Sequence, residues 1–317
     1  MKTTMNIPLY IYTYGCREEE AELCRLEMRS FFGVDSPSNI MISEAAIHPD
    51  RSPFMRERLE VLYVGDTLNE IWEQVKQVQL DDATFKVIFV KTNDLTPDHK
   101  IDFDTARAIE RDIGEYIEGE ADVRNPDFVF GIITLGGRWY FGHYIKSKAV
   151  WLKHSEKPRS YSIALSTRVA RAAANIAVPG LSGVKAIDPC CGIGTVLVEA
   201  LSMGIDIVGR DINPFITRGA RENIKHFDLE TEVVCGDIAD VSGHYDVAIL
   251  DMPYNHFSRT TPEEQLSLIQ HARRIASKVV IIAVDPMDDM LASAGFTIQD
   301  RCTTRKGNFK RQILVCS

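Results

Sequence analysis

Strands and helices alternate regularly along the C-terminal half of this chain. Short apolar runs alternate with amphipathic segments, from Val184–Ile187 to two final runs at Phe296–Cys302 and Arg311–Cys316. Alternation of this kind builds a mostly parallel, doubly wound α/β sheet with helices on both faces. A short loop joins the last two strands, which are therefore expected to be antiparallel. The sequence predicts a Rossmann-like sheet with an antiparallel last strand over residues 161–317.

An aspartate follows each of four successive predicted strands: Asp188, Asp211, Asp237 and Asp251. Ligands of open parallel sheets bind beyond the C-terminal ends of the strands, so these carboxylates are expected to line one site. Aspartate at such turns also serves as a helix N-cap, which is the alternative explanation. Four aspartates at equivalent positions favour a ligand site.

The loop after the first of these strands indicates whether the cofactor is a dinucleotide or another ligand. Gly192 and Gly194 let the backbone approach a ligand closely, but the third glycine of a dinucleotide fingerprint is absent. Asp188 would repel a pyrophosphate and attract the sulfonium and amino groups of S-adenosylmethionine (SAM). We therefore expect SAM, with Asp211 accepting the ribose hydroxyls and Asp237 the adenine amino group.

The N-terminal half contains two smaller groups of predicted strands and helices. A Gly136-Gly137 pair between two alternating runs predicts a β-hairpin within the second group. We expect two α+β domains at residues 1–80 and 81–148, a linker at 149–160, and the Rossmann-like domain at 161–317. This organisation fits the length of 317 residues.

The formal net charge of −9 argues at first against a nucleic-acid partner. The acidic excess lies in residues 1–150, however, and residues 151–317 are balanced. Cations gather in two stretches. The first contains Lys146, Lys148, Lys153, Lys157 and Arg159, and the second, residues 301–311, contains Arg301, Arg305, Lys306, Lys310 and Arg311. The expected RNA contacts are the five cations of the first stretch together with Arg305 and Lys306. A solvated linker or turn has the same composition, but two such stretches favour contact with RNA phosphates.

Several classes are excluded by composition. The seven cysteines are odd in number and contain no Cys-x-x-Cys pair, so neither a disulfide framework nor a metal site is expected, and a reducing cytoplasm fits best. A monomer is the default expectation, because the sequence does not report the oligomeric state. The apolar runs are too short to cross a membrane, and no export signal is visible. Isolated histidines such as His154 are expected at the surface. Cys190 and Cys191 are expected to be small buried residues rather than nucleophiles.

Four motifs resemble the SAM-dependent methyltransferases that modify exocyclic amino groups: DPCCGIGTVLVEA (188–200), GRDINPFITRGARENI (209–224), CGDI (235–238) and DMPY (251–254). Two further segments, KPRSYSIALSTRVARAAANIA (157–177) and RNPDFVFGIITLGGRWYFG (124–142), narrow the resemblance to the THUMP-domain tRNA guanosine-N2-methyltransferases. The resemblance implies ferredoxin-like and THUMP-like domains before the catalytic domain. It also implies methylation of guanosine N2 in tRNA at position 10, with position 6 as the alternative.

The resemblance places the reacting site at Asp251-Met252-Pro253-Tyr254, where the family has Asp/Asn-Pro-Pro-aromatic. Asp251 and the carbonyl of residue 252 would accept the two amino N–H groups, Pro253 would stiffen the turn, and Tyr254 would stack on the extruded base. Met252 departs from the pattern, but any residue supplies a carbonyl. The implied cofactor contacts are Asp188, Cys190, Gly192, Gly194, Thr195, Asp211, Ile212, Asp237, Ile238 and Asp251.

Two other functions stay open. Methyltransferases of adenine N6 or of protein glutamine share the Asp/Asn-Pro-Pro-aromatic motif. An RNA-binding factor with a vestigial, inactive cofactor fold is the second alternative, against which the four intact aspartates argue.

Overall fold

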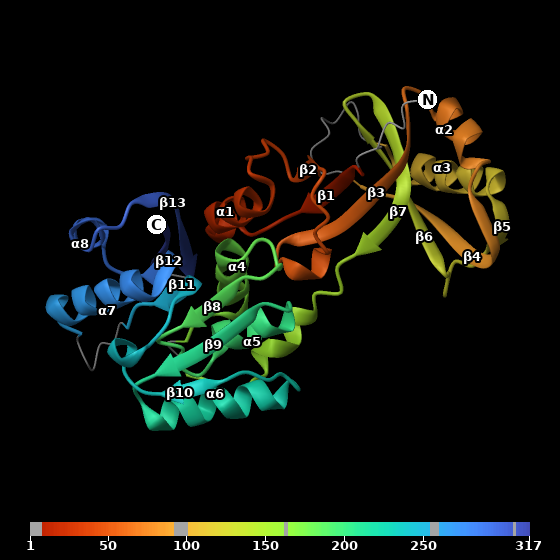
Figure 1. Ribbon diagram of the computed structural model, residues 1–317. Coiled ribbons are helices and arrows are strands. Elements are labelled where there is room, and N and C mark those ends of the chain that lie inside the picture. The colour runs from red at the N-terminus through yellow and green to blue at the C-terminus, as the bar shows by residue number, and fades with distance from the viewer. Residues whose placement is uncertain (1–7, 92–100, 162–163, 254–259, 307–308) are drawn as a thin grey trace, which may run out of the picture. The chain divides into compact units, whose positions relative to one another are not determined.

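In a computed structural model, the chain is described at residues 8–91, 101–161, 164–253, 260–306 and 309–317. It forms two compact units, and each is assembled from segments that are distant in the sequence (Figure 1). The first unit comprises Met1–Gly15, Ser36–Pro49 and Met55–Lys148, and the second comprises Cys16–Asp35, Asp50–Phe54 and Ala149–Ser317.

The first unit is built on a seven-stranded sheet in the order β2-β1-β3-β7-β6-β4-β5. Strand β4 is parallel to both of its neighbours, β5 and β6, and the other neighbouring pairs are antiparallel. Helices α2 and α3 pack against it, at β3 and β7 and at β4 respectively. The bounds are β1 Tyr10–Tyr14, β2 Ile40–Ser43, β3 Met55–Gly65, α2 Leu68–Val75, β4 Gln79–Phe89, α3 Phe103–Tyr116, β5 Glu118–Ala121, β6 Phe128–Leu135 and β7 Arg138–Lys146.

One sheet therefore spans both of the small domains expected from the sequence. The boundary expected at residue 80 falls inside β4, and β3 pairs with β7, with Glu60 opposite His143. This pairing joins residues that are far apart in the chain. Local hydrophobic patterns do not indicate such pairings. The β6–β7 hairpin is confirmed: Gly136 and Gly137 have φ angles of 56° and 79°, in the left-handed region that glycine adopts readily.

The second unit contains a seven-stranded sheet in the order β10-β9-β8-β11-β12-β14-β13. Its first five strands are parallel, β14 is antiparallel to β12, and β13 is antiparallel to β14. This topology confirms the Rossmann-like fold with antiparallel final strands. The bounds are β8 Lys185–Asp188, β9 Asp206–Asp211, β10 Val233–Cys235, β11 Tyr245–Asp251, β12 Ala276–Ala283, β13 Ile298–Lys306 and β14 Phe309–Cys316.

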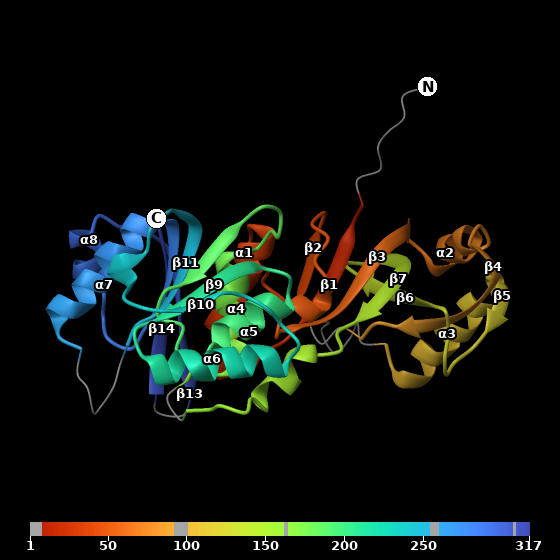
Figure 2. The same cartoon turned by 60° about the horizontal axis from the view of Figure 1, so that its bottom comes forward.

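Helices cover both faces of this sheet. Helix α6 packs beside β9 and β10, α7 beside β11 and β12, and α4 against α5 and the central strands (Figure 2). Side-chain caps fix several helix starts, because Ser166, Asn213 and Thr261 accept backbone N–H bonds at α4, α6 and α7. The bounds are α1 Ala21–Phe32, α4 Thr167–Ala177, α5 Thr195–Ser202, α6 Pro214–His226, α7 Pro262–Ile275 and α8 Asp288–Ser293, with short 3-10 helices at Glu18–Glu20, Pro49–Arg51, Val150–Ser155 and Ile238–Asp240.

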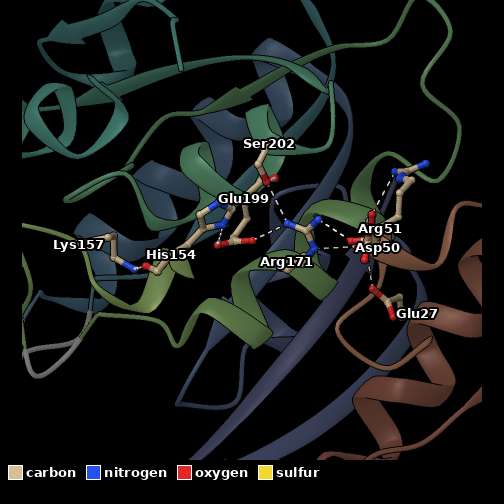
Figure 3. Close-up of polar contacts among 9 residues, drawn as sticks. Glu27, Asp50, Arg51, His154, Lys157, Arg171, Glu199 and Ser202 are labelled. Carbon is tan, nitrogen blue, oxygen red and sulfur yellow. Dashed lines mark hydrogen bonds and ion pairs between the residues drawn. The ribbon is translucent and has the colours of Figure 1, made fainter. Parts of the chain in front are cut away.

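A buried polar network attaches two N-terminal segments to the second unit (Figure 3). Arg171 on α4 is 1% exposed; its Nη1 donates to Glu199 Oε2 at 2.7 Å and its Nε to the carbonyl of Arg51 at 2.9 Å. Asn175, one turn further along α4, donates to Glu27 Oε1 at 2.7 Å. Helix α1 and residues 50–54 are therefore held on α4 by hydrogen bonds that water cannot easily replace.

The expected linker is folded onto the second unit. Residues Val150–Ser155 form a 3-10 helix in which Trp151 is 8% and His154 1% exposed. His154 Nδ1 lies 2.8 Å from Glu199 Oε1. The surface position expected for His154 is wrong, because a buried carboxylate on α5 provides the imidazole with a partner.

Candidate active site

A cavity of about 510 Å³ opens at the C-terminal ends of the parallel strands in the second unit. Residues from the loops that follow β8, β9, β10 and β11 meet there, as the strand-end aspartates predict. Its polar lining includes Asp211, Asp237 and Asp251, and its walls include Gly192 and Cys190. Three of the four aspartates therefore reach one cavity.

The loop between β8 and α5 has a backbone that requires glycine. Gly194 occupies the N-cap of α5 at φ 78°, and a Cβ there would lie 3.2 Å from Cβ of Ala220. Gly192 has φ 53°, and its N–H donates to Asp211 Oδ2 at 2.9 Å. The loop is thus held against the end of β9, with its backbone close to the cavity.

Asp211 organises two loops at once. Its Oδ2 accepts from Gly192 N–H and its Oδ1 accepts from Asn213 N–H, both at 2.9 Å. The N-cap of α6 is Asn213, so the capping explanation does not apply to Asp211. Each carboxylate oxygen has a second lone pair, so Asp211 can still accept hydrogen bonds from a ligand in the cavity.

Asp237 does cap a helix. It is the N-cap of the 3-10 helix Ile238–Asp240 and accepts from Ala239 N–H at 2.8 Å, while its carbonyl accepts from Arg210. It also lines the cavity, together with Ile212 and Ile238. Capping and ligand contact are compatible here because only one carboxylate oxygen is engaged by this bond.

Three expected cofactor residues lie outside the described lining of the cavity: Asp188, Gly194 and Thr195. Asp188 is 2% exposed and accepts from Cys190 N–H at 3.3 Å. Burial raises its pKa well above the usual value, and the neighbouring charges of Asp251 and Asp211 raise it further. These effects favour the neutral carboxyl, so Asp188 acts on the cavity through the backbone of Cys190.

Asp251 ends β11 with one oxygen unsatisfied. Its Oδ1 is buried and has no hydrogen-bond partner among the described residues. Burial raises the pKa of this carboxyl to about 7, and the positive charge of Arg311 opposes the rise. A buried acceptor without a partner is costly, so the geometry suits a donor supplied by a ligand.

The two residues after Asp251 also reach the cavity. Met252 is 3% exposed, and its N–H donates to the carbonyl of Ile282 at 2.8 Å. This bond extends the pairing of β11 with β12 beyond Asp251, so the non-proline residue is held by the sheet. Pro253 follows in the lining, and Tyr254 lies outside the described residues.

The adjacent cysteines have no reactive character. Cys191 is buried, while Cys190 is half-buried and lines the cavity. Burial raises the pKa of both thiols, and the charge of Asp188 raises them further. Both thiols are neutral at physiological pH, which is unsuited to a nucleophile.

Sequence reasoning missed several apolar walls of the cavity: Tyr161, Ile193, Ile216 and Leu268. Tyr161 is 53% exposed and carries an aromatic ring at the rim. Apolar residues with helical or strand periodicity predict a core position equally well, so no local signal separates these residues from the core.

The cations expected to contact RNA lie in different surroundings. Arg159 pairs with Glu222 at 2.5 Å, and Lys157 Nζ donates to the carbonyl of His154 at 3.0 Å. Lys146 and Lys148 belong to the first unit, and Lys153 and Arg305 to the second; all four are exposed. The side chain of Lys306 lies outside the described part of the chain.

Within the described ranges, no group of three or more His, Cys, Asp or Glu residues is arranged to hold a metal ion. In that same part of the chain, every helix is too short or too polar to cross a membrane.

Part of the second unit matches a known protein family. Residues 156–284 match the family model described as UPF0020, RMKL-like methyltransferase domain. A tRNA (guanine(10)-N2)-dimethyltransferase of Methanothermobacter thermautotrophicus is 25% identical over 91% of this chain and 93% of its own length. An enzyme of the same name from Pyrococcus abyssi is 30% identical over 38% of this chain and 37% of its own length.

Among solved structures, TrmN from Thermus thermophilus covers 98% of this chain and 99% of its own, with a TM-score of 0.47 and 15% identity. The matched residues 156–284 include β8 to β12 and the aspartates that follow β8, β9, β10 and β11. Residues 156–284 therefore form a methyltransferase domain, and the chain resembles the THUMP-domain tRNA guanosine-N2-methyltransferases.

Proposed function

We propose that this protein methylates the exocyclic N2 amino group of a guanosine in tRNA, with SAM as the methyl donor and position 10 as the favoured site. The observation that carries the proposal is the buried, unsatisfied Oδ1 of Asp251 at the edge of the cavity. The name of the Methanothermobacter relative, which aligns with nearly the whole chain, supports the substrate and the position.

The cavity fits SAM chemically. Asp211 has acceptor capacity left for ribose hydroxyls, and Asp237 lines the cavity with one carboxylate oxygen available for an adenine amino group. Ile212 and Ile238 provide apolar contacts for the base, and Gly192 and Cys190 provide the backbone wall. The carboxylates of Asp211 and Asp237 in the lining favour a cationic ligand over a pyrophosphate. When bound, SAM supplies a methyl group activated by its sulfonium.

Asp251 has the main role at the reacting group. An aromatic amine is a weak nucleophile because its lone pair is delocalised into the ring. The ionised carboxylate accepts one amino N–H, and the carbonyl of Met252 accepts the other, which aligns the nitrogen and stabilises the positive charge that develops on it. Pro253 restricts the turn that holds these acceptors, and Tyr254 would stack on the extruded base.

The remaining assignments belong to the same proposal. The first unit would include a THUMP-like RNA-binding module, and the exposed cations Lys146, Lys148 and Lys153 would contact phosphates. Position 6 is the alternative site on the tRNA. We also propose that the protein works as a monomer in the cytoplasm.

The test is methylation of an unmodified tRNA transcript. Purified protein with labelled SAM is expected to yield N2-methylguanosine by nucleoside mass spectrometry, and a transcript with adenosine at position 10 is expected to yield none. Asp251→Asn should lower the activity by about 10- to 100-fold. Asp289 is an exposed aspartate on α8, and Asp289→Asn should retain the activity.

Other products would identify the alternatives. N6-methyladenosine as the sole product, or methylated glutamine in a protein substrate, would replace the guanosine assignment. Failure to bind SAM in calorimetry would favour an inactive RNA-binding factor.

A further inference from the structure

A second, smaller cavity of about 230 Å³ lies in the second unit. Three parts of the chain form it: the segment before α1, the first turn of α4, and the β13–β14 hairpin. Its lining is dominated by cations and hydroxyls: Arg17, Ser166, Arg168, Thr304, Arg305 and Arg311, with Glu19, Glu20, Val169 and Phe309 completing it. None of these residues belongs to the lining of the larger cavity.

The charge of this cavity is positive. Arginines outnumber glutamates four to two, and Glu20 is paired with Arg168 at 2.6 Å. Glu19 is the other carboxylate of the lining, which also contains Arg17 and Arg305. The hydroxyl of Ser166 caps the start of α4, where the helix dipole adds further positive potential.

The donor groups of the lining also suit a phosphodiester. Guanidinium groups present fixed pairs of N–H donors that match two phosphate oxygens. Arg311 is 8% exposed, and its guanidinium lies over the ring of Phe309, with Cζ 4.5 Å from the ring centroid. This contact holds the cation in place before a ligand arrives.

The cavity is close to the candidate reacting group. On β14, Arg311 is followed by Gln312, which pairs with Ala283 of β12. The residue before Ala283 is Ile282, which pairs with Asp251 on the other side of β12. The charge of Arg311 also acts on the Asp251 carboxyl. An anion held by Arg311 would therefore lie close to a nucleoside that contacts Asp251.

We propose that the cavity formed by Arg17, Arg168, Arg305 and Arg311 binds a backbone phosphate of the RNA substrate, adjacent to the nucleoside presented to Asp251. This inference rests on the proposed RNA methyltransferase function. It assigns to the RNA two arginines that the charge pattern of the sequence did not select, Arg17 and Arg168. Arg305 and Arg311 lie in the cationic stretch 301–311 that the sequence predicts to contact RNA.

The proposal is tested with variants that lower or raise the positive charge of the cavity. Arg17→Gln and Arg305→Gln each remove a cation at an exposed position, and Glu19→Gln removes an anion from the same cavity. We expect each arginine variant to weaken tRNA binding roughly fivefold and to lower the slope of log Kd against log salt by about one. Glu19→Gln is expected to tighten binding. Lys225→Gln, at the exposed C-terminal end of α6, is the matched control and should leave both quantities unchanged.

The measurements are filter binding of the tRNA transcript over a salt series and calorimetric binding of SAM, with wild-type N2-methylguanosine formation measured in parallel. Unchanged tRNA affinity in both arginine variants, or weaker binding in Glu19→Gln, would overturn the proposal. Competition with inorganic phosphate at constant ionic strength provides a second arm. The Arg305→Gln variant could abolish the competition by phosphate and still bind tRNA with unchanged affinity. That result would identify a site for free anions and would also overturn the proposal. If the wild-type protein methylates no tRNA, the proposed function fails, and the binding series still reports on the cavity.

Discussion

The pH dependence of methyl transfer tests the role of Asp251 most directly. Its pKa is raised to about 7 by burial, so the acceptor form of the carboxylate is lost as the pH falls through neutrality. Below pH 7, kcat/KM for SAM should fall about tenfold per pH unit, and above about pH 8 it should be constant. At pH 5.5 the expected loss is therefore roughly 30-fold.

Two features of the site refine this expectation. The charge of Asp251 raises the pKa of the neighbouring Asp188 carboxyl, so ionisation of Asp251 favours the neutral form of Asp188. At saturating SAM the limb in kcat should move to lower pH, because a bound sulfonium stabilises the carboxylate of Asp251.

The assay is a rate profile from pH 5.5 to 8.5 at constant ionic strength, with circular dichroism to verify that the protein stays folded. Asp251→Asn keeps a carbonyl acceptor but loses the charge. Its rate at pH 8 should fall by about 10- to 100-fold, the range expected for a lost charged hydrogen bond, and its acid limb near pH 7 should disappear. Asp289→Asn should retain the wild-type profile. A wild-type profile that is flat down to pH 5.5, or an acid limb near pH 7 that survives in Asp251→Asn, would refute the reasoning.

Three further predictions concern the cofactor loop, the sheet and the buried network. Asp211→Ala should weaken SAM binding by at least about tenfold in calorimetry, because both the ribose acceptor and the anchor of Gly192 are lost; wild-type affinity would contradict this. Met252→Pro removes the N–H that bonds to Ile282 and should cost about 1 kcal/mol or more of unfolding free energy in urea, whereas Met252→Leu should cost less; equal losses would mean that the bond is unimportant. Burial raises the pKa of Glu27 to about 7 in the folded state, from 4.5 in the unfolded chain. The folded state therefore binds the proton more tightly, and the free energy of unfolding should fall by roughly 3 kcal/mol as the pH rises from 4.5 to 7. Glu27→Gln should flatten that dependence, and an unchanged slope would assign it to another group.

The sequence predicts the second unit well because its signals are local. Each parallel strand is a short apolar run, and each ends at a polar residue that the topology brings to one edge of the sheet. The pattern alone therefore identifies Asp211, Asp237 and Asp251 as residues of the cavity. The same pattern could not distinguish Asp188, which is buried outside the described lining of the cavity, because its position in the motif is equivalent to theirs.

The first unit and the N-terminal segments are less predictable for the opposite reason. Strand β3 pairs with β7 across a long stretch of chain, and residues of α1 and 50–54 pack on α4 through Glu27, Arg51 and Asn175. Hydrophobic periodicity identifies which face of an element is buried, but not which partner covers it. The division expected at residue 80 follows the order of elements along the chain, whereas the sheet follows their pairing.

Local patterns thus determine the alternating elements, the hairpin at Gly136-Gly137 and the row of strand-end carboxylates, because these features depend on residues that are close together in the sequence. The tertiary structure decides which carboxyl remains buried without a partner among the described residues, and it brings Arg17 and Arg168 together with Arg305 and Arg311 around one cavity. Desolvation and charge clustering depend on neighbours that are distant in the sequence. The chemistry of Asp251 and the arginine cavity therefore emerges only when the chain is folded.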